Sequence, residues 1–335
     1  MVFLIVLAIV LMAVAGWLLA RENFYQMFEA IKSANGLLIG AAIAINFISL
    51  AVWAGRWQTA LSFINCRVDF GARYLIICAT VFLNNITPMA RFGGDPFGRA
   101  YLLYKRENIS YPSALASIIC EHALVPLIVV SFLMAGLLLQ FGKGSLQLTL
   151  ILIVAWALAA SAIVLIPRLF FKKRIAVRSV SSITSRVLGW LGKRGKVQKT
   201  IEGIEAFYLS AYATMDKWEK VLLMVGWSFL IGVLDVLQLY VIFLALGYHH
   251  PELSMLLVAS SLPIIAGLIP LLPGGLVLVE GSLMSTFALF GVPLNLAMAA
   301  TVIERGITFA LSTIVGAVVF SYLGVKMAAK PEVQS

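Results

Sequence analysis

Charged residues are scarce in this chain of 335 residues: Asp, Glu, Lys and Arg make up 12%, hydrophobic residues make up 61%, and the mean hydropathy is +1.00. This composition excludes an ordinary soluble domain, whose surface carries far more charge. Apolar runs of roughly 20 residues, enough to cross a hydrocarbon layer of about 30 Å, occupy residues 2–20, 36–54 and 146–166. Runs of similar length that carry some charge occupy residues 114–139, 221–246 and 294–322. The sequence predicts an all-α, polytopic helical membrane protein with a single integral membrane domain, residues 1–335.

Cysteine and histidine are also rare. The chain has three of each, at positions 66, 78 and 120 and at positions 122, 249 and 250. These spacings match neither a disulfide framework nor a set of metal ligands, so we expect no metal and no other cofactor. A glycine-rich nucleotide-binding loop is missing as well, which argues against an enzyme that uses a nucleotide-linked donor.

Acidic residues are fewer than basic ones, 15 against 25, and much of the excess falls between residues 168 and 219. The positive-inside rule places this basic loop in the cytoplasm, and the count of spans then places both termini there and Gly142 and His249 outside. The protein is thus expected in the cell membrane. The loop shows no nucleic-acid-binding module, so we expect anionic headgroups, and no nucleic acid, as its partners.

The chain contains an internal repeat. Gly93-Gly94 and Gly274-Gly275 are separated by the same number of residues as Pro112 and Pro293, and with a slip of two residues Glu121 matches Glu304. The repeats cover residues 36–140 and 219–323. Each contains a glycine- and proline-broken segment, 74–104 or 254–290, which we interpret as a re-entrant hairpin of two half-helices. Because the span count gives the copies opposite orientations, the fold is predicted to consist of two inverted repeats, typical of secondary transporters.

Four motifs carry a resemblance to a known family: PMARFGGDPFGRAYLL and SALASIICEHAL in the first half, and PLLPGGLVLVEGSLMSTFALFG and AATVIERGITF in the second. They resemble the lysylphosphatidylglycerol synthase transmembrane-region family. This flippase-like membrane domain has uncharacterised archaeal and bacterial members, and the resemblance covers nearly the whole chain. It implies lipid translocation, in some members beside an aminoacyl-lipid synthase domain. The chain departs from the family at Asp95, where Glu is usual, at Val277, where Gly often stands, and at His122, where Arg is common. The last departure weakens the expectation of a carboxylate–guanidinium pair in the first half.

An ionisable side chain at the centre of a membrane helix costs roughly 2.5 to 3.5 kcal/mol on insertion scales, so such residues should face one another or a wet cavity. If the glycine pairs begin half-helices, their free N–H groups and helix dipoles favour an anion, and arginine forks suit phosphate oxygens. The predicted substrate-binding residues are Arg91, Gly93, Gly94, Asp95, Arg99, Gly274 and Gly275.

The remaining ionisable residues are predicted to form a polar core or to couple transport to protons, and they are Glu121, His122, Asp235, Glu280, Glu304 and Arg305. Two alternatives stay open for Asp95 with Arg99, four residues apart, and for Glu304 with Arg305: structural ion pairs or substrate and proton handling. Glu280 has no basic residue three or four positions away. It is therefore the predicted coupling carboxylate.

The function predicted from these features is the translocation of an anionic lipid, a phospholipid or a polyprenyl-phosphate-linked glycolipid. One alternative is a membrane-embedded glycosyl- or aminoacyl-lipid transferase that uses Asp95 or Glu280 as its base. Another is an accessory subunit that presents lipid to a partner enzyme. The expected partner is a membrane lipid with an anionic headgroup, and assembly with a second copy or with a lipid-modifying enzyme is left open.

Overall fold

The computed structural model describes residues 22–87, 93–107, 109–142, 145–172, 197–216, 218–267 and 275–328. This part of the chain is helical and contains no strand, as predicted. Five helical segments within it are long and apolar enough to cross a membrane: Gly36–Ile64, Tyr111–Phe141, Leu146–Leu165, Trp218–Ala245 and Leu294–Lys326. The first predicted span, residues 2–20, lies outside the described residues.

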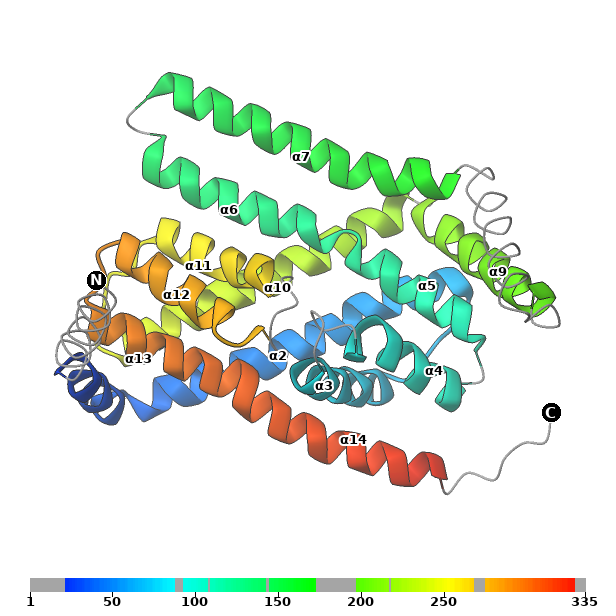
Figure 1. The fold of residues 1–335 in the computed structure, drawn as a ribbon, viewed down its shortest axis with the longest axis horizontal. Coiled ribbons are helices and arrows are strands. Elements are labelled where there is room, and N and C mark those ends of the chain that lie inside the picture. The colour runs from blue at the N-terminus through cyan, green and yellow to red at the C-terminus, as the bar shows by residue number, and fades with distance from the viewer. Residues whose placement is uncertain are drawn as a thin grey trace, which may run out of the picture.

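Figure 1 shows the arrangement of the helices. In chain order they are α2 (Gly36–Leu61), α3 (Phe70–Ile86), α4 (Arg99–Glu107), α5 (Tyr111–His122), α6 (Val125–Phe141), α7 (Leu146–Lys172), α9 (Val197–Asp216), α10 (Trp218–Ala245), α11 (Leu253–Ala266), α12 (Leu278–Leu289), α13 (Leu294–Arg305) and α14 (Ser312–Ala328). Short irregular turns are η1 (Ser62–Ile64), η2 (Gly93–Gly98) and η5 (Gly306–Leu311), the last two with π-helical hydrogen bonding.

Helices α2 and α10 form an antiparallel pair through the centre of the molecule. At one end Asn35 donates its backbone N–H to the carbonyl of Ala245 at 2.9 Å, and at the other Lys220 Nζ donates to Ser62 Oγ at 2.9 Å. Helix α2 continues to Leu61, beyond the predicted end of the span at Ala54. Its extra turns are buried by the protein, which is why polar residues are tolerated there.

Two hydrophobic cores lie at opposite ends of this pair. One packs the ends of α2 and α10 around Trp57, Leu103 and Met224, together with α3, α4 and α5. The other packs the opposite ends around Phe243 and Phe287, together with α11, α12 and α13. Figure 1 shows the same separation, with α3 to α5 at one end and α11 to α13 at the other. Each core therefore surrounds one broken segment, and α2 and α10 contribute residues to both cores.

Both broken segments consist of helices too short to span a bilayer. In the first, α3 has 17 residues and α4 has 9; in the second, α11 has 14 and α12 has 12. The connecting residues 88–92 and 268–274 lie outside the described part. The predicted interruption of each segment is confirmed, whereas their re-entrant course relative to a membrane stays a prediction.

The long spans that follow the broken segments are themselves interrupted, each directly after its acidic residue and the basic residue beside it. Helix α5 ends at His122 and α6 begins at Val125, while α13 ends at Arg305 and the π-turn η5 leads into α14. The pieces have equal lengths in both halves: α5 and α13 have 12 residues, and α6 and α14 have 17. The predicted spans 114–139 and 294–322 therefore fall within segments long and apolar enough to cross a membrane, and each segment consists of two helical pieces.

The two halves exchange their last helices. Helix α6 packs against α11 of the second half, and α14 packs against α3 of the first. A methyl group added at Gly136 of α6 would meet the carbonyl of Ser254 at 2.8 Å and the amide N of Val258 at 3.2 Å. One added at Gly316 of α14 would meet the corresponding atoms of α3, the carbonyl of Cys78 and, at 3.1 Å, the amide N of Phe82. This reciprocal packing supports the inverted repeat, which stays a prediction.

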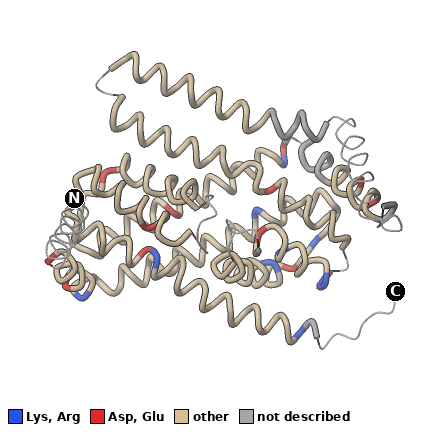
Figure 2. The backbone as a smooth tube through the Cα atoms, in the orientation of Figure 1, with Lys and Arg blue, Asp and Glu red and all other residues tan. Residues whose placement is uncertain are grey.

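The periphery is formed by α7 and α9. Helix α7 packs on α6, and none of the residues of its 146–165 span is buried. Figure 2 shows α6 and α7 without charged residues along this stretch. Within the predicted basic loop, 168–219, α7 runs on to Lys172 and α9 covers Val197–Asp216 against α5, whereas residues 173–196 lie outside the described part. Its cytoplasmic side stays a prediction.

Candidate functional site

Glu121, at the end of α5, is the centre of a buried ion cluster in the first half. Arg56 Nε of α2 and Arg99 Nη2 of α4 donate to its two carboxylate oxygens, each at 2.8 Å. Trp53 Nε1 donates to the same carboxylate at 2.9 Å. The side chains of Glu121 and Arg99 are 0% exposed. Such a pair is stable only because each buried charge has a partner.

The cluster continues from Arg99 to Asp95 and His122. Arg99 Nε lies 2.8 Å from Asp95 Oδ1, and His122 Nε2 lies 2.9 Å from Asp95 Oδ2. The Arg99 guanidinium also lies over the rings of Trp53 and Trp57, 5.4 and 4.8 Å from their centroids. We call Arg56, Asp95, Arg99, Glu121 and His122 the Glu121 network. Its two guanidiniums balance its two carboxylates, as a low-dielectric interior demands.

Several predictions fall on this network. The Asp95–Arg99 pair forms as the four-residue spacing indicates, and Glu121 has guanidinium partners although His122 stands where the family often has Arg. Arg99 is predicted to hold a lipid phosphate, but in this conformation a phosphate would have to displace Glu121 or Asp95. The lipid-binding role of Arg99 stays a prediction.

The glycine pairs do not begin half-helices where they were predicted to. Helix α4 begins at Arg99, and Gly93 and Gly94 belong to the turn η2, where the Asp95 N–H already donates to Asn84 Oδ1 at 2.8 Å. A methyl group at Gly94 would be 2.5 Å from that oxygen, so the turn is packed tightly against α3. Gly275 precedes α12, which begins only at Leu278. Arg91 and Gly274 lie outside the described residues.

Arg56 was not among the predicted site residues. It lies just beyond the predicted span 36–54, yet it is only 4% exposed. A signal was present in the sequence, because Trp53, Arg56, Trp57 and Ala60 recur at helical spacing and share one face. That pattern indicates that the helix continues past the apolar run and that Arg56 faces the protein interior.

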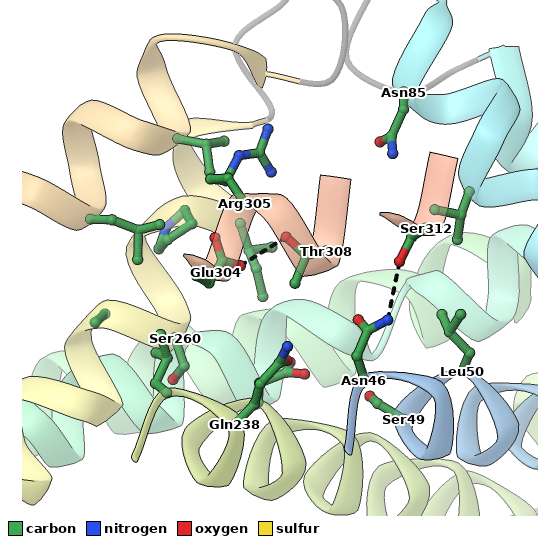
Figure 3. Close-up of a pocket in the computed structure, with 18 of the residues that line it drawn as sticks. Asn46, Ser49, Leu50, Asn85, Gln238, Ser260, Glu304, Arg305, Thr308 and Ser312 are labelled. Atoms are coloured by element: carbon green, nitrogen blue, oxygen red, sulfur yellow. Dashed lines mark hydrogen bonds between the residues drawn. The ribbon is translucent and has the colours of Figure 1, made fainter. Parts of the chain in front are cut away.

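A polar cavity of about 260 Å³ lies between the two halves. Its wall includes α2 and α3 from the first half and α10, α11, α12, α13, η5 and α14 from the second (Figure 3). About half of the lining residues are polar or charged, and they are Asn46, Ser49, Asn84, Asn85, Asp235, Gln238, Ser260, Glu304, Arg305, Thr308 and Ser312. Of the predicted residues, Asp235, Glu304 and Arg305 therefore meet in one place.

Two carboxylates face this cavity from different helices. Asp235 of α10 is hydrogen-bonded to the hydroxyl of Ser49 and is close enough to Glu304 of α13 for their charges to interact. Thr308 Oγ1 donates to Glu304 Oε1 at 3.0 Å, as Figure 3 shows. The cavity wall therefore carries two carboxylates together with the guanidinium of Arg305.

Arg305 forms its ion pair across two helices. Its Nε lies 2.6 Å from Glu280 Oε1 of α12, with the side chains of Arg305 and Glu280 13% and 26% exposed. The guanidinium also lies 4.8 Å from the ring centroid of Phe309. Arg305 thus pairs with Glu280, which lies 25 residues earlier on another helix. Glu280 is not the isolated carboxylate that its local sequence indicated.

The amides that line the cavity differ in how they are used. Asn46 Nδ2 donates to Ser312 Oγ at 3.1 Å, and Asn85 Nδ2 donates to Thr313 Oγ1 at 2.8 Å, so both bind the first half to α14. Gln238 of α10 is 4% exposed, yet its Nε2 has no hydrogen-bond partner among the described residues. Gln238 also lines the cavity, and buried amide groups are nearly always paired in proteins.

Known proteins similar to this chain are membrane proteins. The chain matches the family described as "Lysylphosphatidylglycerol synthase TM region" over residues 4–316. Two UPF0104 membrane proteins of Methanothermobacter thermautotrophicus are 28% and 27% identical to it, covering 91% and 96% of this chain and 91% and 94% of their own lengths. A UPF0104 membrane protein of Methanocaldococcus jannaschii is 24% identical, covering 89% of this chain and 88% of its own. No solved structure matched.

Proposed function

The chain belongs to the lysylphosphatidylglycerol synthase transmembrane-region family, and we propose that it moves an anionic lipid across the membrane. The observation that carries this proposal is the polar cavity whose wall is shared by the two halves of the chain. Transporters built from inverted repeats place their substrate site between the repeats, where relative motion of the halves exposes it to each side in turn.

The physical obstacle to lipid movement is the headgroup, because a polar group without hydrogen-bond partners costs several kcal/mol in hydrocarbon. The cavity offers carboxylates, amides and hydroxyls that replace water around such a group. The outer face of the molecule is apolar, as along α7, where Leu150, Ile151 and Leu158 are exposed. A lipid can therefore place its headgroup in the polar cavity while its acyl tails stay in the apolar bilayer.

Within this proposal, the cavity residues hold the headgroup and the Glu121 network holds the first half together. Arg305, on the cavity wall and paired with Glu280, is the cation closest to the proposed lipid phosphate. Arg91 and Gly274, whose predicted roles are binding of the same phosphate, remain part of the proposal.

A reconstitution experiment tests lipid movement. The purified protein is incorporated into vesicles that contain phosphatidylglycerol with a fluorophore on its acyl chain, and a membrane-impermeant reductant reports how much label reaches the outer leaflet. We expect faster exchange than in protein-free vesicles, and exchange about tenfold slower with Glu304→Gln, which removes a charge from the cavity. Glu29→Gln is the control, because Glu29 lies on the exposed surface. Exchange no faster than in protein-free vesicles refutes the proposal.

We also propose that residues 168–219 and both termini are cytoplasmic, with Gly142 outside. In a variant whose cysteines at 66, 78 and 120 are replaced, a single Gly142→Cys substitution is labelled in whole cells by a membrane-impermeant maleimide. If the Gly142→Cys variant is labelled only after the cytoplasmic face is made accessible, the proposed orientation is wrong. The two halves would still be oppositely oriented to each other.

A further inference from the structure

Most members of the Glu121 network have counterparts in the second half of the chain. The members of each pair hold the same place: the last two positions of α5 and α13, the same distance beyond the glycine pair, and the same distance from the start of α2 and α10. In this order the pairs are Glu121 with Glu304, His122 with Arg305, Arg99 with Glu280, and Arg56 with Gln238. The remaining member, Asp95, corresponds to the apolar Leu276. The second half therefore contains an altered copy of the network.

One contact of the network recurs in the copy with other side chains. In the first half Arg99 Nη2 lies 3.2 Å from His122 Nε2 and joins α4 to α5. In the second half Arg305 Nε lies 2.6 Å from Glu280 Oε1 and joins α13 to α12. The correspondence taken from sequence positions therefore agrees with the spatial arrangement of these helices.

The contact that joins α2 to α5 does not recur. Arg56 Nε donates to Glu121 Oε1 at 2.8 Å, whereas Nε2 of its counterpart Gln238 is buried and has no hydrogen-bond partner among the described residues. Gln238 and Glu304 instead line the polar cavity from α10 and α13 (Figure 3). The cavity therefore lies at the place where, in the first half, an arginine binds two helices together.

We propose that Gln238 is a positioning residue that keeps the cavity between the halves open, because this neutral side chain stands where an arginine would join α10 to α13. The inference rests on the proposed function, in which the lipid needs an open cavity. An ionised carboxylate has about four acceptor positions, and Glu121 accepts hydrogen bonds from three side chains. Glu304, with Thr308 as one of its partners, can accept a guanidinium in the same way, and Asp235 lines the same cavity.

The experiment introduces the missing arginine and measures how open the cavity is. In a variant whose cysteines at 66, 78 and 120 are replaced, Ser260→Cys places one thiol on the cavity wall. Its rate of reaction with a small water-soluble thiol reagent is measured on the purified protein. Adding Gln238→Arg should slow this reaction at least about tenfold and raise the midpoint of thermal unfolding, because a hydrogen bond to an ionised group is strong enough to shift an equilibrium between open and closed forms by that factor.

Two further variants separate the position from the charge. Gln147→Arg adds the same side chain on the exposed surface of α7 and is the matched control. Gln238→Met keeps the length of the side chain but removes its amide. Because the amide donor has no partner to lose among the described residues, Gln238→Met should leave the unfolding midpoint and the labelling rate near those of the parent.

Each other outcome overturns one of the two proposals. Unchanged labelling or a lower midpoint with Gln238→Arg overturns the role of Gln238, since the guanidinium then finds no carboxylate. Equal slowing by Gln238→Met also overturns it, because filling the space and not the charge would close the cavity. In vesicles, Gln238→Arg should slow phosphatidylglycerol exchange at least about tenfold. If the parent moves no lipid, or if labelling slows while lipid exchange does not, movement of lipid through the cavity fails and the role of Gln238 is decided by labelling alone.

Discussion

Glu121 and Glu304 occupy corresponding places in the two halves, yet their surroundings are opposite. Each lies one residue before the end of a helix of 12 residues that is followed by a break. Glu121 is 0% exposed and receives two guanidiniums, whereas Glu304 lines the cavity and receives the hydroxyl of Thr308. Two carboxylates at matching places in the two halves therefore differ in their partners and in their surroundings.

The difference has a physical origin in charge balance. In the first half, guanidiniums neutralise the carboxylates and no solvent is needed, so the network can be sealed by Trp53 and Trp57. In the second half, Asp235 and Glu304 are two carboxylates that line one cavity, a place where ionisable residues within a membrane protein are tolerated. We therefore expect substitutions in the Glu121 network of the first half to destabilise the fold. Substitutions of the cavity carboxylates in the second half should instead weaken binding of the lipid.

The largest effect is expected from Glu121→Gln. It leaves Arg56 and Arg99 buried beside a neutral amide, and breaking a buried pair by removing one partner costs about 3 to 5 kcal/mol. Thermal unfolding of the purified protein should show a much lower midpoint, with little folded protein recovered. Glu304→Gln, the corresponding change in the other half, should unfold close to the parent. A Glu121→Gln variant as stable as Glu304→Gln would remove the distinction between the halves.

The sequence predicted the parts of this molecule that depend on short-range patterns. Long apolar runs identified spans because helix length is set by the bilayer, and the four-residue spacing of Asp95 and Arg99 identified their ion pair. The partners of Arg56 and Glu280 were missed because they lie 65 and 25 residues away, on other helices. Spacing along one helix carries no information about such contacts. The cavity was missed for the same reason, since seven helices and the turn η5 contribute to its wall.

The next effect concerns the packing that the halves share. Gly136→Ala and Gly316→Ala each introduce a methyl group against the backbone of the opposing helix, and overpacking of this kind typically costs about 1 to 3 kcal/mol. We expect both variants to lose similar stability in thermal unfolding. Gly324→Ala, on the same helix as Gly316 but with nothing within 4 Å of the added methyl, should be neutral or stabilising because alanine favours a helix. If only one of the two interface variants is destabilised, the packing of the halves is not equivalent.

A smaller loss is expected from Glu280→Gln. The substitution removes the charged partner of Arg305, but the two side chains are partly exposed, so water compensates part of the loss and the cost should be about 1 kcal/mol. The decisive measurement is the unfolding midpoint together with the pH dependence of lipid exchange on one preparation. A structural ion pair predicts a lower midpoint and an unchanged pH profile. A stable variant whose exchange no longer depends on pH would restore the coupling role predicted from the sequence.

The smallest effect, and one of opposite sign, is expected at Val277, before α12. Its φ of +72° is a conformation that β-branched residues rarely adopt, whereas the corresponding part of the first half is a turn built around glycines. The Val277 side chain is 69% exposed, so Val277→Gly removes strain with little loss of buried surface. Strain of this kind costs about 1 to 3 kcal/mol, and the greater freedom of glycine in the unfolded chain offsets about 0.5 to 1 kcal/mol of the gain.

We therefore expect Val277→Gly to raise the free energy of unfolding by about 1 kcal/mol, measured as a higher midpoint of thermal unfolding. Val325→Gly is the matched control, because Val325 is 73% exposed and lies in α14, where glycine is a poorer helix former than valine. The two substitutions have the same chemistry and should shift the midpoint in opposite directions. A lower midpoint for both variants would mean that the positive φ of Val277 causes no strain. The turn before α12 would then be as free of strain as the glycine turn of the first half.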